Sequence, residues 1–174
     1  FVSAVNQALV INLTASKKAS ISFNALLSSV HRNYAVTQLN NNTIILAVKV
    51  RNGILQGKSY LQIVTKGGAV TINNGQLTIN NADEATIYLT AGTTYKNYKD
   101  VSADAASPCI KALVSIKGKT YKQIKSAHVG EYQKWFNTFS IALGDASKTA
   151  VPTEERLRDF YNGNDASFAA LYTQ

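Results

Sequence analysis

Residues 69–80 read AVTINNGQLTIN, and this stretch contains a complete hairpin signal. Apolar and polar residues alternate on both sides of the dipeptide Asn74-Gly75. Alternation with a period of two is typical of a β-strand, and Asn-Gly tolerates the positive φ angles of a type I′ turn. The stretch therefore predicts two antiparallel strands joined by a tight turn.

Strands of the same kind extend over the first hundred residues. Leu9, Ile11 and Leu13 share one strand face, and Asn52-Gly53 is a further turn signal. The expected strands span residues 7–15, 20–28, 34–39, 43–50, 59–66, 69–74, 75–81 and 85–92. Short strands at a spacing of about ten residues predict antiparallel sheets packed as a sandwich, because a parallel α/β sheet would need helices between them.

The apolar period changes after residue 100. From Ser107-Pro108 onward the pattern is helical, and Gly118 is the expected break between two helices. In the second, aromatic and apolar residues lie mostly three or four apart, which predicts an amphipathic helix of about five turns that ends near Gly144. The residues of this face are Tyr121, Ile124, His128, Tyr132, Trp135, Phe136 and Phe139. The predicted fold is an antiparallel β-sandwich followed by α-helices.

Two further helix starts follow. Thr153 is the expected N-cap of one helix, with Glu154 and Glu155 complementing its dipole, and Asp165 is the expected N-cap of the next. The apolar face of that last helix has only begun to form at Gln174. We expect its covering surface, and the natural start of a chain that opens without methionine, to lie outside these residues.

Composition excludes several classes of protein. The chain is 45% apolar and 16% charged and has no apolar run near the roughly 18 residues of a membrane span. The net charge of +8 comes from lysines scattered singly or in pairs, which indicates a solvated surface rather than a nucleic-acid interface. A single cysteine, Cys109, allows no internal disulfide and is interpreted as a half-buried helix residue.

Candidate catalytic residues are few. No phosphate loop, GxSxG, HExxH or CxxC motif occurs. The adjacent carboxylate pairs Asp83-Glu84 and Glu154-Glu155 fit a strand entrance and a helix first turn, so neither is favoured as the acid and base of a glycosidase. His31 is expected in a loop, and His128 is expected to pack on the apolar face of its helix rather than to catalyse.

Aromatic residues offer a second kind of site, because an aromatic face can stack on a sugar ring. The candidates are Trp135, Tyr88, Tyr95, Tyr98, Tyr121 and Tyr132. Trp135 is flanked by Phe136 and Phe139 at helical spacing, so a core anchor is the favoured interpretation.

The helical part resembles a known family. The string His128-x-x-Glu131-Tyr132-Gln133-x-x-Phe136-x-x-Phe139-Ser140-Ile141-x-Leu143-Gly144 is similar to the linker of glycoside hydrolase family 95, the α-L-fucosidases and some α-L-galactosidases. Residues 152–157 and 165–172 continue the similarity. Residues 1–29 and 81–95 resemble strands of that family's N-terminal β-domain, while Phe139 and Ala142 depart from its usual residues.

The resemblance implies an incomplete β-super-sandwich at residues 1–100, a helical linker at 101–163, and at 164–174 the first helix of an (α/α)6 barrel that is absent here. It implies a secreted or periplasmic parent enzyme that hydrolyses fucosylated glycans by inversion. The family's catalytic motifs lie beyond Gln174, so no catalytic, cofactor-binding or metal residue is assigned.

We therefore expect a non-catalytic fragment whose linker helices pack on the barrel through their aromatic faces, with no cofactor, nucleic acid or membrane as partner. Exposed helices could also pair two copies of such a fragment. The alternative is a stand-alone β-sandwich module that binds carbohydrate or mediates adhesion through exposed tyrosines, and a weaker alternative is a nucleic-acid binder based on the charge of +8.

Overall fold

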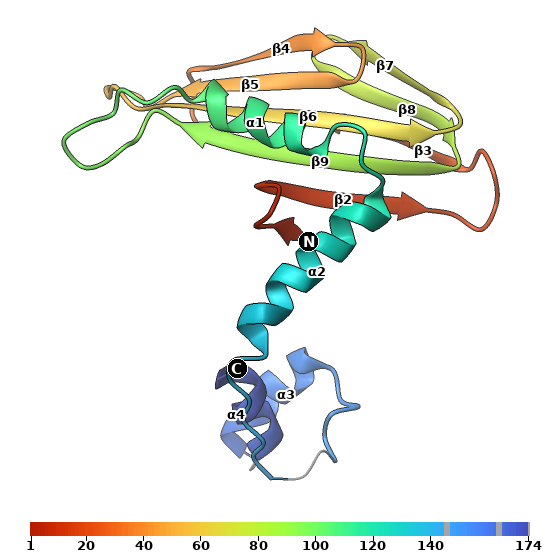
Figure 1. The fold of residues 1–174 in the computed structure, drawn as a ribbon, viewed down its shortest axis with the longest axis vertical. Helices are drawn as coiled ribbons and strands as arrows, with labels where there is room; N and C mark the ends of the chain where they lie inside the picture. Colours follow the sequence, from red (N-terminus) through yellow and green to blue (C-terminus); the bar gives the residue numbers. More distant parts are fainter. Residues whose placement is uncertain (145–146, 163–164, 174) are drawn as a thin grey trace. The chain divides into compact units, whose positions relative to one another are not determined.

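The computed structural model describes residues 1–144, 147–162 and 165–173. The chain divides into two compact units, residues 1–128 and residues 129–174. The first unit contains the strands and the helix α1, and the second contains the helices α3 and α4 (Figure 1). The helix α2 begins in the first unit and ends in the second.

The strands of the described residues form two antiparallel sheets. The larger sheet has the order β1-β2-β9-β6-β5-β4 and the smaller has the order β3-β8-β7. The larger consists of β1 (Val2–Ser3), β2 (Ala8–Thr14), β9 (Glu84–Thr93), β6 (Gln56–Lys66), β5 (Thr43–Lys49) and β4 (Tyr34–Asn40). The smaller consists of β3 (Ile21–Leu26), β8 (Gln76–Ala82) and β7 (Ala69–Asn73). All eight predicted strands are confirmed, and only the short β1 was not predicted.

The hairpin that joins β7 and β8 has the expected turn. Asn74 has φ of 49° and Gly75 has φ of 75°, both in the left-handed region that the type I′ turn requires. Val70 pairs with Ile79, and Ile72 pairs with Leu77. The local sequence therefore fixes both the turn and the register of this hairpin.

A hydrophobic core fills the space between the two sheets. Ile44, Leu61 and Ile63 come from the larger sheet, and Leu77 and Ile79 come from the smaller one. All five are buried, and full burial of such a side chain contributes about 1.5–3 kcal/mol. The β-sandwich predicted from the sequence is confirmed, and this core holds it together.

The other face of the larger sheet is covered by α1 (Ala106–Ile116), which lies over β9 and β6 (Figure 1). Cys109, Ala112 and Ile116 are its buried residues, so Cys109 is fully buried and not half-buried as predicted. The Nδ2 of Asn6 donates to the Oγ of Ser115 at 3.0 Å. Helix and sheet are thus joined by both packing and a hydrogen bond.

The long helix α2 (Tyr121–Phe136) is shorter than predicted. Thr138 ends it, because both its backbone N–H and its hydroxyl group donate to the carbonyl oxygen of Trp135, at 3.0 and 2.6 Å. A threonine side chain that bonds the backbone competes with continued helix. Phe139 and Gly144 therefore lie outside the helix, although both were expected at its C-terminal end.

The second unit contains α3 (Thr153–Asp159), a short 3-10 helix, η1 (Phe160–Asn162), and α4 (Ala166–Thr173). The N-cap of α3 is Pro152, so the prediction of Thr153 was wrong by one position. The N-cap predicted at Asp165 is confirmed, because its Oδ1 accepts a hydrogen bond from the backbone N–H of Phe168 at 2.9 Å. The expected boundary between the linker and the barrel helix, residues 163–164, lies outside the described residues.

Candidate functional site

A groove of about 610 Å³ lies beside α1, on the outer face of the larger sheet. Its walls are aliphatic and come from Ile110, Leu113 and Val114 of α1 on one side and from Leu39 and Val64 on the other. This volume lies within the range of about 300–1,000 Å³ that is usual for ligand pockets. We refer to this cavity as the α1 groove.

The floor of the α1 groove is polar because three strands present polar side chains in register. Thr43 of β5 pairs with Gln62 of β6, and Gln62 pairs with Tyr88 of β9. The Nε2 of Gln62 donates to the Oγ1 of Thr43 at 3.2 Å, and that hydroxyl group donates to the Oδ1 of Asn42 at 3.1 Å. Hydrogen bonds thus hold the floor in one arrangement.

Two tyrosines of the floor remain neutral. Tyr60 and Tyr88 are each only 4% exposed, and burial raises the pKa of both phenols above the ordinary value of 10.0. Nearby charges act in the same direction, from Cys109 and Asp104 on Tyr60 and from Glu84 on Tyr88. These rings have no open face on which a sugar could stack, so the prediction of Tyr88 as a stacking residue was wrong.

No described residue that lines the α1 groove is a carboxylate or a histidine. The lining therefore does not include the pair of carboxylates that most glycoside hydrolases use. Its rim carries the two lysines Lys117 and Lys119, in the connection that leads from α1 to α2. The groove is thus an apolar cleft with a polar floor and a basic rim.

The two carboxylate pairs lie at a strand entrance and in the first turn of a helix, where the sequence placed them. The Oδ1 of Asp83 accepts a hydrogen bond from the backbone N–H of Ala19 at 2.7 Å, and the Oε1 of Glu84 accepts one from the Nδ2 of Asn12 at 2.7 Å. Glu154 and Glu155 are exposed in the first turn of α3. Each position fits a strand or helix terminus, and neither pair lines the α1 groove.

The histidines also lie where the sequence placed them. His31 is exposed in the connection before β4. The ring of His128 stacks on the ring of Phe1, with centroids 4.6 Å apart and planes 8° from parallel, which confirms the packing role. Burial raises the pKa of the Cys109 thiol, so it is an unreactive residue under α1.

The described residues hold no group of three or more His, Cys, Asp or Glu side chains that could bind a metal ion. Over the same part of the chain, no helix combines the length and apolar character needed to cross a membrane.

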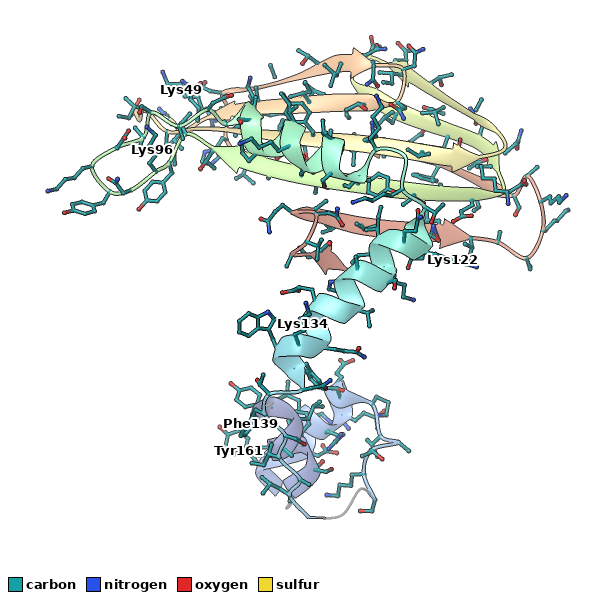
Figure 2. All side chains as sticks on the ribbon, viewed as in Figure 1. Lys49, Lys96, Lys122, Lys134, Phe139 and Tyr161 are labelled. Atoms are coloured by element: carbon teal, nitrogen blue, oxygen red, sulfur yellow. The ribbon has the colours of Figure 1, made fainter. Side chains whose placement is uncertain are left out.

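Several large apolar side chains of the second unit are exposed. Trp135 is 72% exposed and its Nε1 donates to the Oε1 of Glu131 at 2.9 Å, so the prediction of a core anchor was wrong. Phe139 and Leu171 are 51% and 56% exposed. Figure 2 shows Phe139 and Tyr161 on the surface of this unit. Within the described residues, each of these large apolar side chains is therefore exposed.

A buried ion pair joins α3 to the start of α4. The Nε of Arg156 donates to the Oδ2 of Asp165 at 2.9 Å, and its second nitrogen donates to the Oδ1 at 3.0 Å. The same guanidinium group lies 5.1 Å from the ring centroid of Phe168. Sequence analysis identified Asp165 only as a helix cap, because its partner lies nine residues earlier with no motif to connect them.

Comparison with known proteins identifies the class of this chain. Residues 1–98 match the family model described as glycosyl hydrolase family 65, N-terminal domain, and residues 120–174 match the model of the glycosyl hydrolase family 95 catalytic domain. The chain belongs to the family described as glycosyl hydrolase family 65, N-terminal domain. The match at residues 120–174 supports the resemblance of the helical part to family 95.

One curated relative is Alpha-L-fucosidase 2 of Arabidopsis thaliana. The two sequences are 28% identical over 206 residues, an alignment that covers 100% of this chain and 24% of the relative. The chain thus spans about a quarter of that relative's length. A solved structure provisionally named as a kojibiose phosphorylase from human microbiome matches with a TM-score of 0.42 and 17% identity, over 77% of this chain and 18% of that one.

Proposed function

We propose that the chain is the sandwich and linker part of a longer α-L-fucosidase-type hydrolase and has no hydrolase activity by itself. The longer enzyme would remove terminal α-L-fucosyl or α-L-galactosyl residues from glycans with inversion, outside the cytoplasm or in the periplasm. One observation carries this proposal: a single chain matches a sandwich domain at residues 1–98 and then a catalytic domain at residues 120–174.

The exposed apolar side chains support a missing neighbour. Trp135, Phe139 and Leu171 all belong to the stretch that matches the catalytic domain, and each is more than half exposed. An apolar surface of this kind is normally covered by other protein. In our proposal an (α/α)6 barrel covers it, and the linker helices support that barrel.

The α1 groove has no carboxylate or histidine among its described lining residues, which supports the proposal that this part of the enzyme is inactive by itself. Inverting hydrolysis needs one carboxylic acid and one base, about 6.5–9.5 Å apart. The lining of that groove includes neither Asp83-Glu84 nor Glu154-Glu155. The catalytic residues would therefore come from the barrel.

The test compares two proteins on one substrate. We expect the 174-residue chain to release no nitrophenol from an aryl α-L-fucoside, while the longest product of the same gene releases it with net inversion, followed by NMR of the anomeric proton. Measurable turnover by the 174 residues alone would disprove the inactive role. A long gene product that hydrolyses neither aryl fucosides nor aryl galactosides would disprove the parent activity.

Calorimetric titration of the 174-residue chain with fucosylated oligosaccharides separates this proposal from the stand-alone binding module. The exposed tyrosines Tyr95 and Tyr98 lie in the connection between β9 and α1 and are the residues such a module would use. We expect no saturable heat from these sugars, whereas the alternative requires it.

A further inference from the structure

We propose that a pocket at one end of the sandwich binds an anionic sugar residue, one that carries a carboxylate or a sulfate ester. This inference rests on the proposed function, because the sugar residue would belong to the glycan from which the longer enzyme removes a terminal fucosyl group. Three observations support it: the shape of the pocket, the position of two lysines in it, and the charge around it.

The pocket has a volume of about 320 Å³ and a floor of small side chains. Ala35 of β4 pairs with Ala47 of β5, and both lie at its base, where they leave room above the strands. Its volume is near the lower end of the usual range of about 300–1,000 Å³, so it suits a short part of a glycan. We refer to this cavity as the basic pocket. Its polar lining comes from Asn33, Tyr34, Lys49, Gln56 and Lys58.

The two lysines of the basic pocket are diagonal neighbours on one face of the larger sheet. Lys49 of β5 pairs with Gln56 of β6, and Lys58 follows Gln56 by two residues, so both lysine side chains leave the sheet on the same side. Diagonal neighbours lie about 7–8 Å apart, a distance over which two long side chains can reach a single anion. Each ammonium group would donate charge-assisted hydrogen bonds to the carboxylate or sulfate.

The remaining side chains of the lining suit a sugar ring. Tyr34 is 44% exposed, so part of its aromatic face is open for stacking on the apolar face of a sugar. The amide groups of Asn33 and Gln56 are exposed and can both donate to and accept from sugar hydroxyl groups. A simple inorganic anion would use the lysines but neither the tyrosine nor the amides.

The charge around the basic pocket favours an anion. Residues 27–33, 49–58 and 93–104 meet at this end of the larger sheet. The backbone N–H of Lys49 donates to the carbonyl oxygen of Asn33 at 3.0 Å, and that of Thr94 donates to the carbonyl oxygen of Gln56 at 2.9 Å. The three segments carry six lysines and arginines but two aspartates. Figure 2 shows Lys49 and Lys96 at this end.

Both aspartates already have partners. The Oδ2 of Asp100 lies 3.2 Å from the Nζ of Lys96, and the Oδ1 of Asp104 accepts a hydrogen bond from the backbone N–H of Ala106 at 2.9 Å. The described lining of the basic pocket contains no carboxylate. Lys49 and Lys58 are therefore left to an anion from outside the chain.

The occupant is a glycan rather than a nucleic acid. Proteins that bind single-stranded nucleic acid use a long basic groove with several aromatic side chains, whereas the basic pocket is small and has one tyrosine in its described lining. The chain also matches two glycosyl hydrolase families, which act on glycans. An anionic glycan accounts for the tyrosine, the amides and the lysines together.

Calorimetric titration of the long gene product and of the 174-residue chain tests the proposal. The probes are tetragalacturonate, a sulfated tetrasaccharide and a neutral galactotetraose. The main variant is K49E/K58E, and the matched control is K17E/K18E, which changes the net charge by the same amount. Lys17 and Lys18 are exposed between β2 and β3, and β2 ends at Thr14, which pairs with the first residue of β9 at the other end of the sheet.

We expect saturable binding of at least one anionic probe and none of the neutral one. K49E/K58E should weaken that binding by at least about tenfold, because two attractive charges become repulsive, while K17E/K18E should change it by less than about twofold. The probe that binds shows whether a carboxylate or a sulfate is preferred. Circular dichroism verifies folding, and K49Q/K58Q replaces the main variant if charge reversal unfolds the chain.

An equal loss of binding in K49E/K58E and K17E/K18E would overturn the proposal, since the attraction would then be non-specific. Tighter binding of a single-stranded oligonucleotide than of either anionic glycan would also overturn it. So would binding by the 174-residue chain that the long gene product lacks, because the pocket would then be a covered surface. The aryl fucoside assay on the unchanged long protein decides the proposed function separately, since that substrate carries no anionic sugar.

Discussion

Replacing Gly92 with alanine should loosen the contact between β9 and α1 that shapes the α1 groove. A Cβ added at Gly92 would lie 2.4 Å from the carbonyl oxygen of Ala105 and 2.6 Å from the Cγ of Pro108. Ordinary contact begins at 3.4 Å, so strand and helix must separate by about 1 Å. The obstructing oxygen belongs to the backbone at the start of α1, where no side chain can rotate away.

The expected change in the free energy of unfolding is the sum of two opposing contributions. Overpacking of this kind costs about 1–3 kcal/mol, and alanine restores about 0.4–1 kcal/mol by restricting the unfolded chain. A net loss of about 1–2 kcal/mol remains, and each kcal/mol corresponds to about 2–4 °C in the unfolding midpoint of a chain of this length. We therefore expect the midpoint to fall by about 2–8 °C.

Far-UV circular dichroism of thermal and urea unfolding measures this change. The matched control is Gly130→Ala on α2, where an added Cβ meets nothing within 4 Å and alanine is the better helix former by about 1 kcal/mol. The control should not lower stability. A Gly92→Ala variant as stable as the unchanged chain would show that α1 does not pack on the sheet in this way.

Two further predictions concern packing and pH. Ile124→Ala should lower the free energy of unfolding by about 2–5 kcal/mol, because the side chain of Ile124 on α2 is fully buried. The control Ile54→Ala, at a residue that is 73% exposed, should change it by less than about 0.5 kcal/mol. Urea titration measures both changes. The hydrogen bonds from Arg156 hold the pKa of Asp165 well below the ordinary 3.8. The stability from this pair is therefore complete above pH 3.8 and is lost as pH falls through the lowered pKa of Asp165. The protection of the Phe168 amide, which is its exchange rate relative to the intrinsic rate at the same pH, should therefore fall only in acid, and Asp165→Asn should lower that protection already at neutral pH.

The strands could be located from the sequence because alternation and turn chemistry are local properties. Their order in the sheets could not. β9 lies between β2 and β6 in the larger sheet, although the sequence places most of the other strands between β2 and β9. One signal was available: Ile87, Tyr88 and Leu89 are consecutive apolar residues, which indicates a strand covered on both faces.

The α1 groove could not be predicted, because its residues come from distant parts of the sequence. Thr43, Gln62 and Tyr88 meet only through the register of three strands, and α1 contributes the opposite wall. The helical period correctly indicated an apolar face around Trp135. It could not show whether the chain covers that face, since covering depends on elements far from it in sequence.

The distribution of charge explains why a net value of +8 misleads. Residues 1–128 carry 14 basic and 4 acidic side chains, whereas residues 129–174 carry 4 basic and 6 acidic side chains. The positive charge therefore belongs to the first unit, whereas the second unit is slightly acidic, so the net value of +8 describes neither of them.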